Sequence, residues 1–470
     1  MFFEHKNQKA KYKKMMKTIF YFILFITSVA NAQYSIKGTM SPKIVSDWVI
    51  LYKVEGTKQV FVSNTTIKID SMTISGKKKA ISRFEFTLKP EAKPGAYRIS
   101  YRTEGEGFLD FFFNKENISF IFNPDYPDQT VSFSKSSENK LYKEYSAAIS
   151  KAQSKLDSIQ IAAVQNPKAD LKTAYQKAYK KVNTIQNKYV EVSKEKYIAP
   201  IIKASVQSNS TDILTSVDAY LFNIKNTFFN KLDFSNKTLL NSSFLTDRIV
   251  SYVFYINYSD DNRTQQRLYK ESIETVLSKI KNQTYKRDII EFLIVQFEAY
   301  KNLEIIDYLF ENKYNKLPEA LQSAKFKAEK KALFASEVGR TAPDFSWKEN
   351  GKTLKLSTLN DAEKYVLVFW STTCSHCMRE MPLLHTYLKN KKNIKVIAFA
   401  LEDDAFVWEN YSKTNLNGWH NVLGLNKWEN ETAKAYQIFS TPSYFVLDKN
   451  KKIVAKPYDI DEVKEYLEKK

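Results

Sequence analysis

The stretch that decides the fold is residues 366–377, which read VLVFWSTTCSHC. The run VLVFW at its start is entirely apolar, which is typical of a β-strand buried on both faces of a sheet. Both cysteines of the 470-residue chain, Cys374 and Cys377, follow this run closely. Strand-like and helix-like segments alternate on either side of it, so the sequence predicts an α/β domain over residues 336–470.

A helix is expected to begin at the two cysteines, and this position favours redox chemistry. The N-terminus of a helix has unpaired N–H groups and a partial positive charge, and both stabilise a thiolate. The thiolate is the form that attacks a disulfide. We therefore expect Cys374 to be the exposed nucleophile. Cys377, one turn into the helix, should be the shielded thiol that resolves the mixed disulfide, and such a pair needs no metal or organic cofactor.

Three other roles stay open for the two cysteines at this point. A structural disulfide across so short a loop would add little stability. A zinc site would need further ligands, and the chain has no second CxxC motif. A copper site could combine the cysteines with His376 or His385.

The composition narrows the class of protein. Lys and Arg total 72 against 52 Asp and Glu, which gives a formal net charge of +20. Hydrophobic residues make up 43% and aromatic residues 14%, which is enough for sizeable cores and excludes a largely disordered chain. Two cysteines are too few for a disulfide-stabilised scaffold. The positive charge indicates a lysine-rich solvated surface, and no nucleic-acid partner is expected.

Residues 1–32 are expected to be a cleavable signal peptide. The basic segment Lys11–Lys17 precedes an unbroken apolar run, Ile19–Ile26, and Ala30-Asn31-Ala32 has the A-x-A pattern of a cleavage site. The apolar run is short for a membrane span, so no transmembrane anchor is expected after signal removal. The sequence therefore predicts an exported protein.

Two further regions are expected between the signal peptide and the α/β domain. Residues 33–136 contain short apolar or aromatic runs separated by turn residues, for example Trp48–Val54 and Phe108–Phe113, which predicts an antiparallel β-sandwich. Residues 137–335 contain no glycine and show helical spacing of apolar residues, as at Ile289 and Leu293, which predicts an all-α region.

Several motifs of the last domain together resemble a known family. They are GRTAPDF at 339–345, the stretch 366–377 with MREMP at 378–382, and YQIFSTPSYFVLD at 436–448. The resemblance is to the TlpA/ResA-like family of exported thiol–disulfide oxidoreductases. It implies a thioredoxin fold with an additional strand and helix at residues 393–419, and a periplasmic location in a Gram-negative bacterium. Members of this family often act as reductants, including on the cysteines of apocytochromes.

The resemblance also implies roles for individual residues. The family's proline at Pro442 is cis and faces the CxxC motif, which leaves the backbone of Thr441 able to pair with a substrate strand. Trp370, Thr441 and Pro442 are therefore expected to contact the substrate. Glu380 matches a family glutamate that tunes the cysteines, and it would relay the proton when Cys377 attacks.

His376 departs from the family pattern, because the commoner residue there is proline. An imidazole beside Cys374 would stabilise the thiolate and so raise the reduction potential of the pair. This effect would act against the reducing direction that the family favours.

The upstream regions are similar to those that precede TlpA-like domains in other exported proteins of one Gram-negative group. The motifs GAYRI at 95–99 and NKLDFSNKTLL at 230–240 carry this weaker resemblance. It implies no particular partner for these regions.

The sequence thus predicts a periplasmic thiol–disulfide oxidoreductase that exchanges disulfides with exported, cysteine-containing polypeptides. Reduction is slightly favoured over oxidation, and a membrane thiol–disulfide protein is expected as electron donor or acceptor. The alternative is an exported binding or adaptor protein. In that case residues 33–335 would bind the ligand, and the last domain would be an accessory or a copper chaperone.

Overall fold

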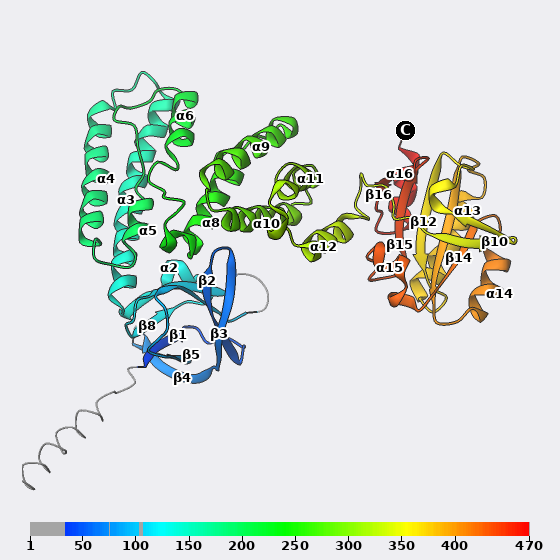
Figure 1. Ribbon diagram of the computed structural model, residues 1–470, viewed down its shortest axis with the longest axis horizontal. Helices are drawn as coiled ribbons and strands as arrows, with labels where there is room; N and C mark the ends of the chain where they lie inside the picture. The colour runs from blue at the N-terminus through cyan, green and yellow to red at the C-terminus, as the bar shows by residue number, and fades with distance from the viewer. Residues whose placement is uncertain (1–32, 75, 103–106, 470) are drawn as a thin grey trace, which may run out of the picture. The chain divides into compact units, whose positions relative to one another are not determined.

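The computed structural model describes residues 33–74, 76–102 and 107–469, so the predicted signal peptide, residues 1–32, lies outside the described residues (Figure 1). The chain divides into two compact units, Met1–Leu321 and Gln322–Lys470, called here the N-terminal and C-terminal units. No helix in the described part of the chain combines the length and the apolar character needed to cross a membrane.

The N-terminal unit begins with a β-sandwich, as the sequence predicts. One sheet has the strand order β4-β5-β1-β8-β9 and the other β3-β2-β6-β7. Ile36, Phe84 and Phe120 of the first sheet share one buried core with Leu51 and Phe111 of the second. The strands are β1 (Tyr34–Met40), β2 (Trp48–Glu55), β3 (Lys58–Thr66), β4 (Lys68–Ile74), β5 (Lys77–Leu88), β6 (Gly95–Ser100), β7 (Phe108–Phe113), β8 (Ile118–Phe122) and β9 (Ser132–Lys135).

Two details of the sandwich go beyond the sequence pattern. β1 pairs in parallel with β8, with Gly38 opposite Phe120, although the other pairs are antiparallel. β4 has no buried residue, so it carries no apolar alternation from which it could be predicted.

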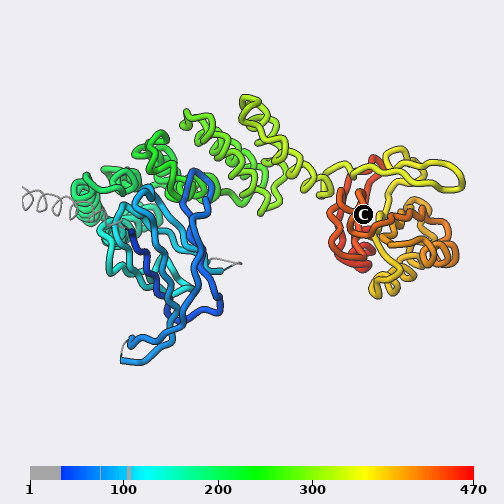
Figure 2. The backbone as a smooth tube through the Cα atoms, turned by 60° about the horizontal axis from the view of Figure 1, so that its bottom comes forward, coloured from blue at the N-terminus to red at the C-terminus, as the bar shows by residue number. Residues whose placement is uncertain are grey.

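The helices belong to the same unit, and all those listed here except α2, which lies between β8 and β9, follow the sandwich (Figure 2). Asn139 joins the two parts, because its side chain accepts a hydrogen bond from Phe112 N at 2.8 Å and donates one to Phe112 O at 2.6 Å. The helices are α2 (Pro127–Thr130), α3 (Ser137–Gln165), α4 (Lys172–Val192), α5 (Ala199–Ala204), α6 (Val217–Thr227), α7 (Lys237–Leu240), α8 (Ser243–Val250), the π-helix η1 (Ser251–Ile256), α9 (Asn262–Lys279), α10 (Gln283–Ala299), α11 (Leu303–Asn312), η2 (Tyr314–Lys316) and η3 (Glu319–Leu321).

The C-terminal unit is built on a mixed sheet with the order β14-β13-β12-β15-β16. β12 is parallel to β13 and antiparallel to β15, so the expected thioredoxin fold is confirmed. Its elements are α12 (Ala324–Phe334), β10 (Ser346–Glu349), β11 (Lys352–Lys355), η4 (Leu356–Thr358), β12 (Lys364–Trp370), α13 (Ser375–Leu388), β13 (Ile394–Glu402), α14 (Phe406–Asn415), β14 (His420–Leu425), η5 (Lys427–Glu429), α15 (Glu431–Ala435), β15 (Ser443–Asp448), β16 (Ile453–Ala455) and α16 (Ile460–Glu468).

β12 is buried on both faces, as its apolar sequence predicts. Residues 365–370 are all 0% exposed. Tyr365, Leu367 and Phe369 point into the core that the β10–β11 hairpin and α15 cover. Val366, Val368 and Trp370 point into the opposite core, which α13 and α16 cover. The strand is therefore held in place from both sides up to the residue where the loop to Cys374 begins.

The additional segment of the sheet extends further than the sequence predicts. Residues 393–419 hold β13 and α14, and the edge strand β14 follows them. Gly424 lies in β14 where a Cβ atom would come within 2.2 Å of the Phe399 ring. Only glycine fits there without displacing the ring.

α12 groups with the C-terminal unit, although the sequence places the domain boundary after it, at 335/336. Its last turn is tied to this unit by a hydrogen bond of 2.8 Å from Gln437 Nε2 to Ala332 O. The compact units therefore divide at Leu321 and Gln322.

Candidate active site

Cys374 and Cys377 lie where β12 passes into α13. Cys374 is the N-cap residue of the helix, and its sulfur accepts a hydrogen bond from Cys377 N at 3.4 Å. Both residues are free thiols. Cys374 is partly exposed, whereas Cys377 is completely buried. The helix N-terminus thus presents one sulfur to solvent and shields the other, which is the arrangement that the sequence predicts.

The surroundings favour the thiolate of Cys374. Burial opposes its ionisation, but hydrogen bonds from the side chains of Cys377 and Thr441 and from the N–H groups of Cys377 and His376 outweigh burial and lower the pKa of Cys374. The stabilisation comes from hydrogen bonds at the helix N-terminus rather than from a neighbouring cation.

The same surroundings keep Cys377 protonated. Burial, together with a hydrogen bond to Cys374, raises the pKa of Cys377 to about 12. A thiol with so high a pKa needs a base when it attacks. The two cysteines therefore differ in protonation at neutral pH, with Cys374 as the better nucleophile.

Glu380 lies on the same helix as the buried thiol of Cys377 and is hydrogen-bonded to Tyr444. It lies one turn beyond Cys377 on α13, on the same side of the helix. Its Oε2 accepts a hydrogen bond of 2.8 Å from the hydroxyl of Tyr444. Tyr444 is 2% exposed, and burial, followed by the hydrogen bond to the Glu380 carboxylate and the charge of that group, raises the pKa of Tyr444. The Tyr444 hydroxyl thus stays protonated and orients the Glu380 carboxylate, one turn beyond Cys377 on α13.

Sequence reasoning missed Tyr444, although a signal was present. Tyr444 is two residues after Pro442 in β15, and residues at this spacing share one face of a strand. A tyrosine on the face of the strand that meets the redox helix must find a hydrogen-bond partner once it is buried. Glu380 is that partner.

A second missed residue, Glu402, holds the loop in front of Cys374. Glu402 ends β13 and is 4% exposed. It accepts hydrogen bonds from Thr372 N at 2.6 Å and from Ser371 Oγ at 3.3 Å. Buried carboxylates require such partners, so Glu402 and the loop backbone stabilise one another.

The Thr441–Pro442 bond is cis and lies beside the redox pair. The thiol of Cys374 donates a hydrogen bond to Thr441 O at 3.2 Å. Among the described residues, the N–H of Thr441 has no hydrogen-bond partner, because the pairing of β15 with β12 begins at Ser443. Phe439, close before this loop, is 86% exposed. The loop therefore offers an unpaired backbone group at Thr441, beside Cys374, and an exposed apolar side chain two residues before it.

Trp370 does not take the role that the sequence suggested. It is 0% exposed, and its ring packs in the core against Tyr411, with ring centroids 5.5 Å apart. A substrate polypeptide cannot reach a side chain at this depth, so the assignment of Trp370 to substrate binding is wrong. Its place in β12 explains this, because Trp370 shares the inward face of Val366 and Val368.

The histidines near the pair are placed differently from one another. His376 is exposed, and in the described chain it acts on Cys374 through its backbone N–H rather than through its ring. The His385 Nε2 lies 3.0 Å from Asn417 O, and the His385 ring lies against Trp419. Within residues 33–74, 76–102 and 107–469, no group of three or more His, Cys, Asp or Glu side chains is arranged to hold a metal ion.

The two thiols should differ in their reaction with iodoacetamide. Cys374 should be alkylated at pH values where an ordinary cysteine, with a pKa of about 8.5, is still protonated, because its pKa is lowered. Cys377 should stay unmodified well above that pH, because burial raises its pKa to about 12. Mass spectrometry of the two labelled positions across pH measures this, and a shared pH profile would contradict the assigned roles.

The variant Tyr444→Phe should slow the step in which Cys377 attacks. Without the hydroxyl, the Glu380 carboxylate loses the donor that orients it, and we expect about a tenfold lower rate, the worth of one hydrogen bond to a charged group. With the aromatic disulfide DTNB, the first thionitrobenzoate released reports on Cys374 and the second on Cys377. Only the second release should slow down.

Tyr436→Phe is the matched control for this variant. It also removes a buried hydroxyl, one that donates to Pro343 O at 2.6 Å away from the cysteines. Its two release rates should equal those of the unmodified protein. Equal behaviour of Tyr444→Phe and Tyr436→Phe would show that the Tyr444 hydroxyl has only a structural role.

Known proteins resemble the part of the chain that carries this site. Residues 337–469 match the protein-family model described as Redoxin. A thiol-disulfide oxidoreductase ResA of Geobacillus thermodenitrificans is 28% identical over 156 residues, which are 31% of this chain and 83% of the relative. A ResA of Bacillus subtilis is 26% identical over 130 residues, 26% of this chain and 70% of the relative. A solved thiol-disulfide oxidoreductase of Bacteroides fragilis has 27% sequence identity and a TM-score of 0.25, over 27% of this chain and 97% of that structure.

The matched residues include both cysteines, Glu380 and the Thr441–Pro442 pair. The resemblance seen in the sequence and the geometry of the two thiols agree with this match. Residues 337–469 of this chain therefore carry a redoxin domain, and the relatives that match it are named thiol-disulfide oxidoreductases.

Proposed function

We propose that this protein is a periplasmic thiol–disulfide oxidoreductase that exchanges disulfides with exported, cysteine-containing polypeptides and acts mainly as a reductase. One observation carries the proposal. Cys374 is partly exposed at the N-terminus of α13, with Thr441 O at 3.2 Å from its sulfur and Cys377 buried behind it. Such a site has a nucleophile, a resolving thiol and a backbone edge for the substrate.

The reaction has two exchange steps. The thiolate of Cys374 attacks one sulfur of the substrate disulfide, forms a mixed disulfide and releases the other substrate sulfur as a thiolate. The Cys377 sulfur, after losing its proton, then attacks Cys374 and releases the second substrate sulfur. The substrate gains two electrons and the Cys374–Cys377 pair becomes a disulfide. A membrane thiol–disulfide protein is the proposed donor that reduces the pair again.

Glu380 is the proposed base for the second step. The proton of Cys377 must leave because the pKa of this thiol is raised to about 12. The carboxylate of Glu380, held by Tyr444 at 2.8 Å, lies on the same side of α13 as that thiol. The substrate thiolates that leave are the final acceptors of the protons.

The surface beside Cys374 fits an extended polypeptide. The unpaired N–H of Thr441 can bind the backbone of a substrate strand, as in β-augmentation. The exposed ring of Phe439, two residues before Thr441, is the proposed apolar contact for the substrate. The proposed substrates are therefore polypeptides with an apolar residue close to a reactive cysteine.

The environment of Cys374 supports the reducing direction. A neighbouring imidazolium would stabilise the thiolate strongly and make the pair a better oxidant. In the described chain the His376 ring is exposed, and hydrogen bonds alone offset the burial of Cys374. The periplasmic location rests on the pattern of residues 1–32 and on the resemblance to exported family members.

The variant Cys377→Ser should accumulate mixed disulfides between Cys374 and exported polypeptides. Cys374 can still attack in this variant, but no second thiol resolves the product. Non-reducing gels and mass spectrometry of the purified variant identify the trapped polypeptides, and the double variant Cys374→Ser/Cys377→Ser should trap none. Absence of mixed disulfides in Cys377→Ser would overturn the proposal.

In the unmodified protein, thiol alkylation in cells should find the pair mostly reduced. A mostly oxidised pair would show that the protein acts as an oxidase.

The variant Phe439→Ser should weaken reactions with polypeptides only. We expect kcat/KM for the disulfides of insulin to fall about fivefold, because partial burial of a Phe ring contributes about 1 kcal/mol. The same constant for oxidised glutathione should not change. Phe222→Ser, which removes another exposed Phe ring (71% exposed), serves as the control and should change neither constant. An equal loss for both disulfides would contradict a docking role for Phe439.

A further inference from the structure

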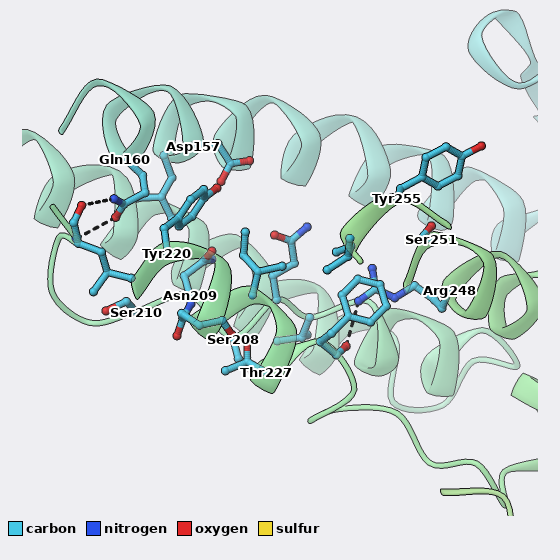
Figure 3. Close-up of a pocket in the computed structure, with 18 of the residues that line it drawn as sticks. Asp157, Gln160, Ser208, Asn209, Ser210, Tyr220, Thr227, Arg248, Ser251 and Tyr255 are labelled. Carbon is cyan, nitrogen blue, oxygen red and sulfur yellow. Dashed lines mark hydrogen bonds between the residues drawn. The ribbon is translucent and has the colours of Figure 1, made fainter. Parts of the chain in front are cut away.

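The helical part of the N-terminal unit encloses a cavity of about 400 Å³ (Figure 3). Its walls come from α3, α4, α6, α8, η1 and the loop between α5 and α6. A cavity of this size holds a small organic molecule. Nothing in the redox chemistry uses it, because both cysteines belong to the other compact unit.

The loop that forms one wall is held in a fixed conformation. Asn209 and Gln153 exchange two side-chain hydrogen bonds, of 2.9 and 3.0 Å. Tyr175 Oη donates to Ser210 O at 2.8 Å, and Gln160 Oε1 accepts from the N–H of Leu214 at 3.1 Å. The cavity is therefore preformed, and binding a ligand would not have to order this wall.

Arg248 lies at one end of the cavity without a counter-charge. Its Nη2 donates to Phe228 O at 3.0 Å and its guanidinium stacks 3.7 Å from the Phe228 ring. Its Nε is buried and has no hydrogen-bond partner. In the described part of the chain no carboxylate forms an ion pair with Arg248, and burial alone lowers its pKa, to about 10. Arg248 thus stays charged at neutral pH and lacks a partner anion.

Burial of a cation without a partner anion costs folding free energy. Such a cation therefore indicates a function other than stabilising the fold. The helix around Arg248 adds a second observation. α8 continues directly into η1, a π-helix, and Ser251, Tyr255 and Ile256 of η1 line the cavity. π-Helical turns are rare and frequently lie at functional sites.

We propose that this cavity binds a small organic carboxylate, with Arg248 pairing with its carboxylate group. A guanidinium recognises a carboxylate through charge-assisted hydrogen bonds, and the partial burial of Arg248 strengthens them. The proposal concerns a binding function of the N-terminal unit and does not depend on the redox reaction.

The rest of the cavity defines the body of the ligand. Asp157 and Gln160 lie at the end opposite Arg248 (Figure 3). Asp157 is negatively charged when ionised, so it disfavours a second anionic group at that end. Apolar side chains line part of the cavity, among them Leu156, Leu214 and Ile224, and polar side chains line the rest, among them Ser208, Asn209 and Thr227. The ligand is therefore a monocarboxylate whose body contacts both apolar and polar side chains.

Isothermal titration of the full chain with 3-phenylpropionate and with its neutral isostere 3-phenylpropanamide tests the proposal. The two probes have the same ring and chain and differ only in charge. The carboxylate should bind saturably and at least tenfold tighter than the amide. Absence of saturable binding, or equal affinities for the two probes, overturns the proposal.

Variants assign the effect to Arg248. Arg248→Gln should remove the preference for the carboxylate, and Arg267→Gln, which changes an exposed arginine paired with Glu271 at 2.8 Å, should keep it. The double variant Cys374→Ser/Cys377→Ser should bind as the unmodified protein does, which separates this site from the redox function.

A stability measurement without ligand distinguishes a binding role from a structural role. Arg248→Met removes an unpaired charge, so the melting temperature of the free protein should rise. A lower melting temperature for Arg248→Met would show that Arg248 stabilises the fold, and the proposal would fail. Arg248→Lys keeps the charge and should retain the preference for the carboxylate. This variant provides the test if Arg248→Gln does not fold.

Discussion

The burial of β12 on both faces is the constraint on which the C-terminal unit depends. All six residues from Tyr365 to Trp370 are 0% exposed, and their side chains alternate between two separate cores. A strand fixed from both sides cannot slide or rotate, because a shift by one residue would exchange the two sets of side chains. The loop after Trp370 and the start of α13 are therefore placed within narrow limits, and so is the sulfur of Cys374.

This constraint also explains how two identical side chains acquire opposite properties. The thiol at the helix N-terminus meets hydrogen-bond donors, whereas the thiol one turn later is enclosed by the core that contains Val366, Met381 and Tyr444. Burial and a helix terminus shift the pKa of a thiol in opposite directions. One helical turn between the partly exposed N-cap and the buried interior thus distinguishes the nucleophilic thiol from the resolving thiol.

The parts of the structure that could be predicted from the sequence are those with a local signal. The apolar run of β12, the CxxC motif after it and the helical spacing around Leu293 each extend over a short stretch of chain. The pairing of Tyr444 with Glu380 joins residues 64 positions apart, so the strand pattern that indicates a buried tyrosine does not identify its partner. Strands β4 and β14 also lack a clear local signal. β4 has no buried residue, and β14 contains Gly424, which lies against the Phe399 ring of the neighbouring strand.

The carboxylate of Glu402 has a consequence for how this domain varies between species. It accepts hydrogen bonds from Ser371 and from the backbone of Thr372, yet it belongs to the neighbouring strand β13. A residue at position 402 without a side-chain oxygen would leave the loop backbone without its acceptor. Residues 371 and 402 should therefore vary together between related domains, because the Ser371 hydroxyl supplies the one side-chain hydrogen bond between the redox loop and Glu402 in the described chain.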